Sequence, residues 1–496
     1  MTATEAGAAR SFAQESKRFG LNALVYLISN VLVRGVSLLL TPLYTRAMDP
    51  SDFAVVAVTN AIGAVLTITL GMALYGCIPR LFFEFKQTER RAFFGTLLAL
   101  SLTVPVVLVA ILFALGSRGY LDVFETVRFN PHLKLVLWTS LFSIYSSLPV
   151  AVYMSHELPR KAAAINMLSG FTQLGFALLF VARLHGGALG VLRANLASSA
   201  IVGAASIVLM LRMSTISLAL PGMRQALVFS LPLVPHLVAN WALSISDRIV
   251  LDRYVPPADI GRYSLGYTFG LIVSVVAASL GNALSPMANR QLRSPATEAN
   301  VPPLGTYMLA ATSAFALVVA MTSGEVIGII APKSYAGASA VAPWAVLGAV
   351  LQGVYLVWSI GTWFSMKTKL VPFITAISAA LNIGVNLVYV PRYGIMAAAV
   401  STVICYAASA AMGGMLAQRL HPIPWEYRRW ALMAAVAFAC YALGMALPTW
   451  GVWESLAAKL TVSVVGFPMG LLALRFFTSS EIERGRAILS RAVGRA

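Results

Sequence analysis

The chain has 496 residues, of which 59% are hydrophobic and 11% are charged, whereas soluble proteins have about 25% charged residues. This composition excludes a soluble enzyme, a disordered protein and a receptor with a single membrane anchor. The net charge of +18 would suggest nucleic-acid binding in a soluble protein. In a membrane protein the basic residues are expected in cytoplasmic loops, so we predict no nucleic-acid partner.

Long apolar runs bounded by charges, Pro or Gly predict an all-α polytopic membrane protein with about fourteen transmembrane helices. A span needs about 20 apolar residues, and an α-helix pairs its own backbone groups within lipid. The predicted spans are 21–45, 53–78, 92–116, 133–155, 161–183, 187–211, 224–246, 258–285, 304–330, 338–364, 370–390, 394–418, 428–448 and 453–476.

The distribution of basic residues predicts the orientation. An even number of spans places both termini on one side of the membrane. Lys and Arg are about twice as frequent in the loops on that side as in the opposite loops, so the positive-inside rule places both termini in the cytoplasm. Segment 1–20 and the tail 478–496 are then cytoplasmic.

An internal repeat predicts two lobes. At an offset of 207 residues, and without a gap, four positions of the first half carry the same residue type as the second half: Arg46 and Arg253, Pro50 and Pro257, Asp52 and Asp259, Pro79 and Pro286. We predict six-helix lobes at 21–212 and 224–419, related by an axis along the membrane normal, as in parallel two-lobe transporters. Helices 13 and 14, at 428–477, follow as an appendage.

Arg34 is the most informative single residue. It lies about 20 Å from Leu21 and about 14 Å from Leu43 along the first predicted helix, at 1.5 Å per residue, too deep to reach either membrane surface. A charge at that depth is costly unless it faces protein or a wet cavity. Arg34 is therefore either an anion-binding group in a central cavity or is paired with backbone carbonyls or another helix.

Spans 6 and 7 contain four further candidates. Arg193 lies in the first turns of span 6, where it either reaches the membrane edge or contributes to a cationic cavity. Pro232 and Pro235 remove backbone donors and are expected to bend or break span 7 as a hinge, and broken spans are common at transporter sites. His236 follows them, as a cavity residue or as a neutral histidine bonded to a freed carbonyl.

Two polar pairs are candidates for the cavity or for structural pairing. Asp247 and Arg248 end span 7. On a continuous helix they point apart, so that one pairs locally while the other faces inward; the alternative is a solvated pair in a loop. Asn382 and Asn386 share a face of span 11. They would bond sugar hydroxyls or, as the preferred interpretation, join two helices.

The acidic residues separate transporter classes. Glu325, near the outer end of its span, is the only acidic residue that lies beyond the second position of a predicted span, and Asp247 borders one. A cation exporter needs deep carboxylates, whereas a deep arginine suits an anion such as a phosphate or pyrophosphate. Cys77, Cys405 and Cys440 are far apart and lack metal-ligand spacing, so we predict no metal site and no cofactor.

Two stretches of the sequence resemble bacterial polysaccharide flippases, the Wzx-type O-antigen and capsule exporters. They belong to the same superfamily as the drug-and-toxin exporters and the lipid II flippase. The residues that carry the resemblance are Ser230 to His236, Trp241, Ser246 to Arg248, Leu251, Gly261 to Ser264, Tyr267 and Pro286, with Asn22, Arg34, Pro42 to Tyr44, Arg46, Asp52 and Phe53 near the start.

The resemblance implies a two-lobed bundle of the bacterial inner membrane that moves an undecaprenyl-pyrophosphate-linked oligosaccharide from the inner to the outer leaflet by alternating access. Its cationic cavity would include Arg34, Arg193, His236 and Arg248, and the last two helices would form a groove for the lipid tail. The implied partners are the lipid-linked oligosaccharide, membrane lipids and polysaccharide assembly proteins. The absence of a deep carboxylate departs from ion-coupled relatives.

Two other functions compete with this one. A drug exporter of the same superfamily predicts an acidic cavity, which the sequence lacks. A membrane-embedded glycan polymerase or glycosyltransferase predicts a large extramembrane loop with paired carboxylates, and no predicted loop exceeds about 20 residues, the length of one span. We therefore predict a transporter rather than an enzyme.

Overall fold

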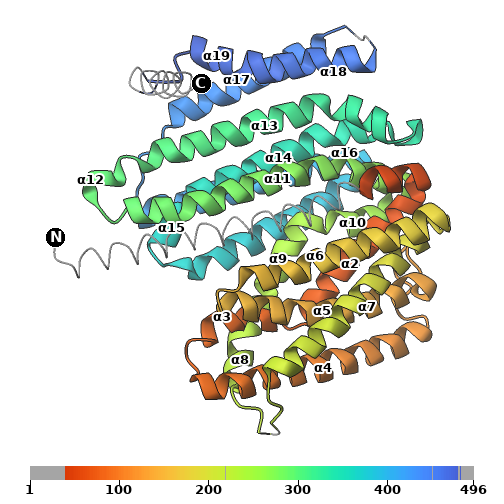
Figure 1. Ribbon diagram of the computed structural model, residues 1–496. Helices are drawn as coiled ribbons and strands as arrows, with labels where there is room; N and C mark the ends of the chain where they lie inside the picture. Colours follow the sequence, from red (N-terminus) through yellow and green to blue (C-terminus); the bar gives the residue numbers. More distant parts are fainter. Residues whose placement is uncertain (1–39, 218, 449–450, 479–480, 482–496) are drawn as a thin grey trace, which may run out of the picture. The chain divides into compact units, whose positions relative to one another are not determined.

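The computed structural model describes residues 40–217, 219–448, 451–478 and 481, and within these ranges helices are joined by loops and turns, with no β-strand (Figure 1). In the first half the main helices are α2 (Pro50–Leu70), α3 (Ile78–Leu81), α4 (Gln87–Ser117), α5 (Lys134–Ser155), α6 (Pro159–Ala177), α7 (Gly187–Met213), α8 (Met223–Ser230), α9 (Leu233–Ile245) and α10 (Asp247–Tyr254). In the second half they are α11 (Pro257–Gln291), α12 (Pro295–Glu298), α13 (Val301–Ile330), α14 (Ala338–Trp358), α15 (Ile360–Phe364), α16 (Val371–Leu420), α17 (Tyr427–Ala446), α18 (Val452–Thr461) and α19 (Phe467–Ala473).

The helix lengths confirm a polytopic membrane protein. In the described part of the chain, 12 helical stretches are long and apolar enough to cross a membrane. One of them, α16, has 50 residues and covers predicted spans 11 and 12. The first predicted span, 21–45, lies mostly outside the described residues. The twelve stretches, with α16 counted twice, account for predicted spans 2 to 14.

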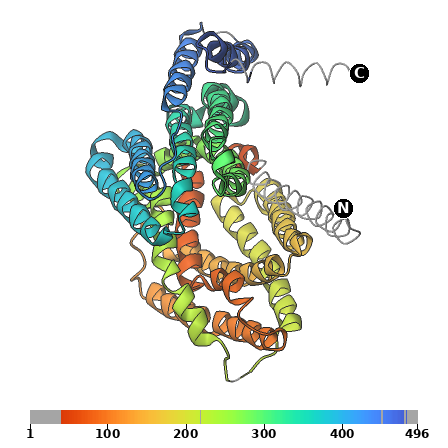
Figure 2. The same cartoon turned by 90° about the vertical axis from the view of Figure 1, so that its left-hand side faces the viewer.

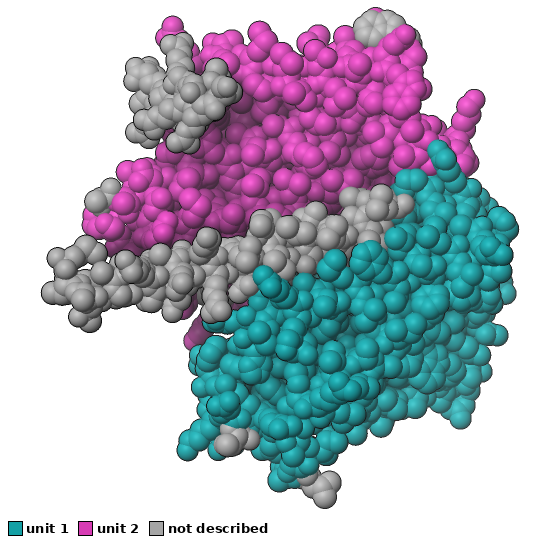
Figure 3. Space-filling view, in the orientation of Figure 1, with its two compact units in different colours: residues 1–261 teal, residues 262–496 magenta. Residues whose placement is uncertain are grey.

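The chain divides into two compact units, Met1–Gly261 and Arg262–Ala496 (Figure 3). The division falls at the start of α11, whereas the sequence places the boundary between the lobes in the loop that precedes α8. The lobe boundaries at 212 and 224 stay a prediction. We describe each unit separately below.

The repeat is visible in the way two helices begin. Pro50 is the first residue of α2 and Pro257 is the first residue of α11, 207 positions later. Proline is favoured there because the first helical N–H has no partner within the helix. Asp52 and Asp259 lie in the two first turns, where a negative charge is favoured by the helix dipole.

In the first unit, α5 packs against α2, α6 and α7. The close approach of α5 and α7 requires Gly203, because a Cβ there would lie 2.7 Å from the carbonyl oxygen of Phe142. Toward the other end of these helices, Phe93, Ile78 and Leu148 are buried in an apolar cluster with α3, α4 and α8. The interior of the unit is therefore built from side chains that are far apart in the sequence.

The second unit is built on α13, α14 and α16, with α14 in contact with both others. α16 reverses at Gly394, which has φ 59 and ψ −142, a backbone conformation open to glycine alone among ordinary residues. The two halves of α16 then lie side by side (Figure 2), and Asn382 on the first half contacts Ser401 on the second. Gly394 is thus the turn between predicted spans 11 and 12.

The last helices pack on α13. α17 and α18 both contact α13 (Figure 1), and α19 contacts α17. Met433 and Cys440 of α17 share an apolar cluster with Met321 of α13 and Phe467 of α19. Glu325 of α13 accepts a hydrogen bond from Lys459 of α18, with 2.6 Å between Oε1 and Nζ. Helices 13 and 14 are therefore an integral part of the second unit.

Arg429 forms an ionic network at the beginning of α17. Its guanidinium donates to Glu426 at 2.9 Å and to Glu481 at 3.2 Å and stacks on the ring of Phe476. Burial alone would raise the pKa of Glu481, but hydrogen bonds from Thr478 and the charge of Arg429 lower it below the usual value of 4.5. The network fixes Glu481 against the start of α17.

This network makes stability depend on pH in the acid range. A lowered pKa in the folded state means that Glu481 stabilises the fold above pH 4.5 and loses this effect as the pH falls further. We expect Glu481→Gln to lower the free energy of unfolding by about 1 kcal/mol near neutral pH, and by progressively less as the solution is acidified below the usual pKa. Thermal unfolding of the purified protein in detergent measures both differences. A difference that stays constant with pH would contradict this origin.

Candidate functional site

Arg34, the predicted centre of the cationic cavity, lies outside the described residues. The described chain begins at residue 40, six residues later. The role of Arg34 therefore stays a prediction, and the other candidates are placed one by one below.

Arg193 lies on α7, about 9 Å from the start of the helix at Gly187, at 1.5 Å per residue. Its side chain is exposed. Two residues later on α7, Asn195 accepts a hydrogen bond at Oδ1 from Gln173 Nε2 of the neighbouring helix α6, at 3.1 Å. Arg193 therefore stands near a polar contact between α6 and α7, toward one end of a span.

Span 7 is broken where the two prolines predicted a bend. α8 ends at Ser230 and α9 begins at Leu233, with Pro232 directly before it. Because neither Pro232 nor Pro235 has an N–H to donate, the helical hydrogen-bond ladder cannot continue through them. His236 lies half-buried in the first turns of α9, and within the described chain its Nδ1 has no hydrogen-bond partner.

A second break lies beside the first. The sequence predicted a continuous span over 53–78, but α2 ends at Leu70 and the chain turns through Met72 and Ala73, both at φ 50. A 3-10 helix (Leu74–Cys77) follows and packs against α8. A Cβ on Gly76 would lie 3.1 Å from Leu233. The prediction of one straight helix was wrong here, because hydropathy does not register the weak helix propensity of glycine.

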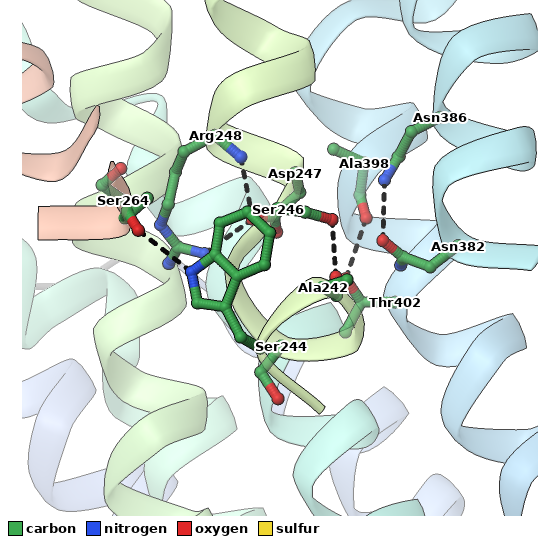
Figure 4. Close-up of polar contacts among 12 residues, drawn as sticks. Ala242, Ser244, Ser246, Asp247, Arg248, Ser264, Asn382, Asn386, Ala398 and Thr402 are labelled. Carbon is green, nitrogen blue, oxygen red and sulfur yellow. Dashed lines mark hydrogen bonds and ion pairs between the residues drawn. The ribbon is translucent and has the colours of Figure 1, made fainter. Parts of the chain in front are cut away.

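Asp247 and Arg248 form a buried pair, which corrects the expectation that their side chains point apart. Arg248 Nη1 donates to Asp247 Oδ1 at 2.7 Å, and the exposed fractions of the two side chains are 8% for Arg248 and 3% for Asp247 (Figure 4). The expectation assumed a continuous helix, but α9 ends at Ile245 and α10 begins at Asp247. At this first position the carboxylate turns back to accept from the backbone N–H of Arg248 at 2.9 Å, and the guanidinium reaches it there.

The neighbouring acid Asp252 also lies near the outer end of predicted span 7 but was not among the predicted site residues. Its buried carboxylate accepts from the backbone N–H groups of Glu125 and Thr126 at 2.8 and 3.0 Å. Arg253 contacts the Glu125 side chain at 3.5 Å in an exposed pair. Asp252 therefore ties α10 to the loop between α4 and α5. The Asp-Arg dipeptide at 252–253 repeats the one at 247–248, and this repetition is the signal that could have shown it.

Asn382 and Asn386 are buried on the first half of α16, as their spacing indicated. Asn386 Nδ2 donates to Asn382 Oδ1 at 3.1 Å (Figure 4). Asn382 Nδ2 lies 3.5 Å from Ser401 Oγ on the second half of α16. Ser401 Oγ also contacts the Asn382 carbonyl oxygen at 3.4 Å. The geometry matches the interpretation that the two asparagines join helices.

The structure thus brings together the members of two predicted pairs, Asp247 with Arg248 and Asn382 with Asn386. Glu325, the acid predicted inside a span, is bonded to Lys459. In the described ranges, no group of three or more His, Cys, Asp or Glu side chains is arranged to hold a metal ion.

Comparison with known sequences shows the family. The model of the polysaccharide biosynthesis protein family matches residues 19–291, which is more than half of the chain. No curated protein sequence matches the chain.

Solved structures show the same fold at low sequence identity. The chain is similar to the lipid II flippase MurJ in an inward closed conformation, with a TM-score of 0.70 and 13% identity over 93% of this chain and 98% of the other. It is also similar to a point mutant of the Vibrio cholerae MATE transporter VcmN, with a TM-score of 0.59 and 13% identity over 83% of this chain and 98% of the other. An inward-facing multidrug transporter of the MATE family gives a TM-score of 0.59 at 13% identity, over 80% of this chain and 97% of the other. The chain therefore belongs to the polysaccharide biosynthesis protein family and has the fold that the lipid II flippase and these multidrug transporters share.

Proposed function

We propose that this protein is a flippase that moves an undecaprenyl-pyrophosphate-linked oligosaccharide from the inner to the outer leaflet of a bacterial inner membrane. Family membership and the shared fold support a transporter of this general kind. The observation that selects an anionic substrate is the pairing of Glu325 with Lys459. In the described part of the chain, the carboxylate predicted within a span is thus neutralised by a cation.

The cationic headgroup site is assigned to Arg34 with Arg193. Bidentate hydrogen bonds from a guanidinium suit a pyrophosphate, and both residues lie within or near the membrane on predicted spans 1 and 6. Arg248 is bonded to Asp247, so its charge is partly neutralised, and we assign it a positioning role. His236 lies beside the break in span 7. We assign it as a polar group of the site, a role that does not require the imidazole to be charged.

The proposed mechanism is alternating access between the two lobes. The pyrophosphate binds from the cytoplasmic side, the glycan occupies a wet space, and the prenyl chain stays in lipid. The breaks at Leu70 and at Ser230 supply positions where spans 2 and 7 can bend without loss of further backbone hydrogen bonds. No bond is made or broken, so the reaction is transport alone.

The proposed orientation places both termini in the cytoplasm, with helices 13 and 14 forming a groove for the lipid tail and 1–20 and 478–496 as cytoplasmic segments. The basic loops support this orientation. A green fluorescent protein fused to the C-terminus tests it, since this reporter folds on the cytoplasmic side, and a dark fusion with normal membrane levels would contradict it.

Deletion of the gene in its source bacterium tests the function. We expect loss of surface glycan and accumulation of the undecaprenyl-linked precursor inside the cell, with unchanged resistance to cationic drugs. Antibody or lectin staining measures the first, and mass spectrometry of extracted lipids measures the second. Normal glycan display together with increased drug sensitivity would instead support a multidrug exporter, the alternative that the likeness to MATE transporters suggests.

A further inference from the structure

A partly open cavity with both polar and apolar walls lies between α2, α5 and α7 of the first unit. It has a volume of about 250 Å³, which corresponds to roughly eight water molecules at about 30 Å³ each. Its polar walls include Asn60 and Thr67 of α2, Thr139 and Ser143 of α5, and Asn195 of α7. The cavity is smaller than the roughly 300–1,000 Å³ pockets that take drug-sized ligands.

Three of the five polar groups lie at similar distances from the starts of their helices. α2, α5 and α7 belong to predicted spans 2, 4 and 6, which cross in the same direction. At 1.5 Å per residue, Asn60, Ser143 and Asn195 lie about 15, 14 and 12 Å from the starts of their helices. Thr67 and Thr139 lie about 26 and 8 Å along α2 and α5, so the polar wall extends along much of the span. Such groups are unfavourable against the hydrocarbon core, so together they indicate a wet space or a polar ligand.

The hydroxyl groups of the wall are arranged as hydrogen-bond acceptors. Thr67, Thr139 and Ser143 each donate to the carbonyl oxygen one turn earlier in their own helix, at 2.7 to 2.8 Å. Each hydroxyl proton is therefore used, and the oxygen lone pairs remain available to a donor in the cavity.

The two asparagines add donors. Asn60 is exposed, and no hydrogen bond is formed by its amide within the described part of the chain. Asn195 accepts from Gln173 through Oδ1, which leaves its amide N–H₂ as a donor. The cavity thus offers both donors and acceptors, and none of its lining residues carries a charge.

We propose that this cavity binds one neutral monosaccharide unit of the transported glycan. A pyranose carries hydroxyls that each donate and accept, which matches the wall. An anionic headgroup would require a cation, and a metal ion would require a carboxylate, neither of which lines the cavity. This inference rests on the proposed flippase function and assigns the sugar to the first unit.

The test compares two probes on the full chain in lipid nanodiscs. One is the undecaprenyl-linked glycan extracted from a strain that lacks this gene, and the other is undecaprenyl pyrophosphate without sugar. Asn60→Leu removes the amide at nearly constant size, and Asn60 has no partner whose loss would unfold the protein. Asn166→Leu is the matched control, since Asn166 lies on α6 of the same unit and does not line the cavity.

We expect Asn60→Leu to weaken binding of the glycan lipid about tenfold, which corresponds to the loss of one to two hydrogen bonds, and to leave binding of undecaprenyl pyrophosphate unchanged. Asn166→Leu should change neither. If Asn60→Leu lowers the amount of folded protein, Ser143→Ala removes one acceptor from the same wall and should weaken glycan-lipid binding about threefold.

Three results would overturn the proposal. Unchanged binding of both probes to Asn60→Leu means that the cavity holds only water. An equal loss for both probes means that the cavity does not bind the sugar. The flippase function stands in either case. If the unmodified protein binds neither probe, the proposed function itself fails, and the cavity proposal fails with it.

Discussion

Arg34→Ala is expected to abolish surface glycan display while the amount of protein in the membrane stays normal. A guanidinium in the middle of a span has a large energetic cost, so its removal does not weaken the fold if its purpose is to bind the pyrophosphate. The loss should be at least about a hundredfold, because charge-assisted bidentate bonds contribute several kcal/mol in a low-dielectric site. Glycan staining and a membrane immunoblot measure the two quantities.

Two comparison variants sharpen this test. Arg34→Lys keeps the charge but not the planar fork, so it should retain part of the activity if charge alone matters and little if bidentate geometry matters. Arg80→Ala is the matched control, since Arg80 is exposed and forms an ion pair with the exposed Glu84. Normal display with Arg34→Ala would refute the assignment, and a fall in membrane level would show that Arg34 has a structural partner.

Breaking the buried pair should have the largest effect on stability. Asp247→Ala leaves the Arg248 guanidinium, which is 8% exposed, without this carboxylate. Loss of one partner of a buried pair costs about 3–5 kcal/mol. We therefore expect Asp247→Ala to lower the free energy of unfolding by an amount in this range, measured by chemical or thermal unfolding in detergent.

The double variant separates pairing from burial. Asp247→Asn with Arg248→Met removes both charges at similar volume, and such replacements are often neutral, so most of the stability should return. Arg253→Ala is the control for an exposed pair, because Arg253 and Glu125 are 67% and 66% exposed and such pairs contribute about 0–1 kcal/mol. Equal losses for Asp247→Ala and Arg253→Ala would contradict a special role for the buried pair.

The fold was predictable because hydropathy and helical spacing determine it directly. The apolar runs predicted the spans, and the reversal of α16 at Gly394 falls where predicted span 11 gives way to span 12. The i, i+4 spacing of Asn382 and Asn386 predicted a shared face, and the structure shows the bond between them. These properties follow from the periodicity of a helix and need no knowledge of tertiary contacts.

Helix breaks and their consequences were harder to predict. A mean hydropathy does not distinguish Gly71 and Gly76 from alanine, so the end of α2 at Leu70 was missed. The predicted orientation of the Asp247 and Arg248 side chains was wrong for a related reason. Helical periodicity applies only where the helix is continuous. The two prolines of span 7 did predict a break, because proline removes a backbone donor whatever its surroundings.

The cavity of the first unit could not be predicted from the sequence alone. Its residues come from three helices, and each hydroxyl there is also an ordinary occupant of a membrane helix. A weak signal exists, because Thr59, Gly63 and Thr67 recur every four residues on α2 and place small or hydroxylated side chains on one face. Only the packing of α2 against α5 shows that this face borders a cavity.

The repeat offset carries the break in α2 onto a part of α11 that is unbroken. Gly71 and Gly76 correspond to Ala278 and Ala283. Pro286 lies inside the continuous α11, whereas its counterpart Pro79 is the second residue of the short α3. The glycine and alanine differences between the two segments therefore accompany the difference between a broken helix and a continuous one. Two copies of a duplicated segment can in this way diverge in stiffness while their residues still align one to one.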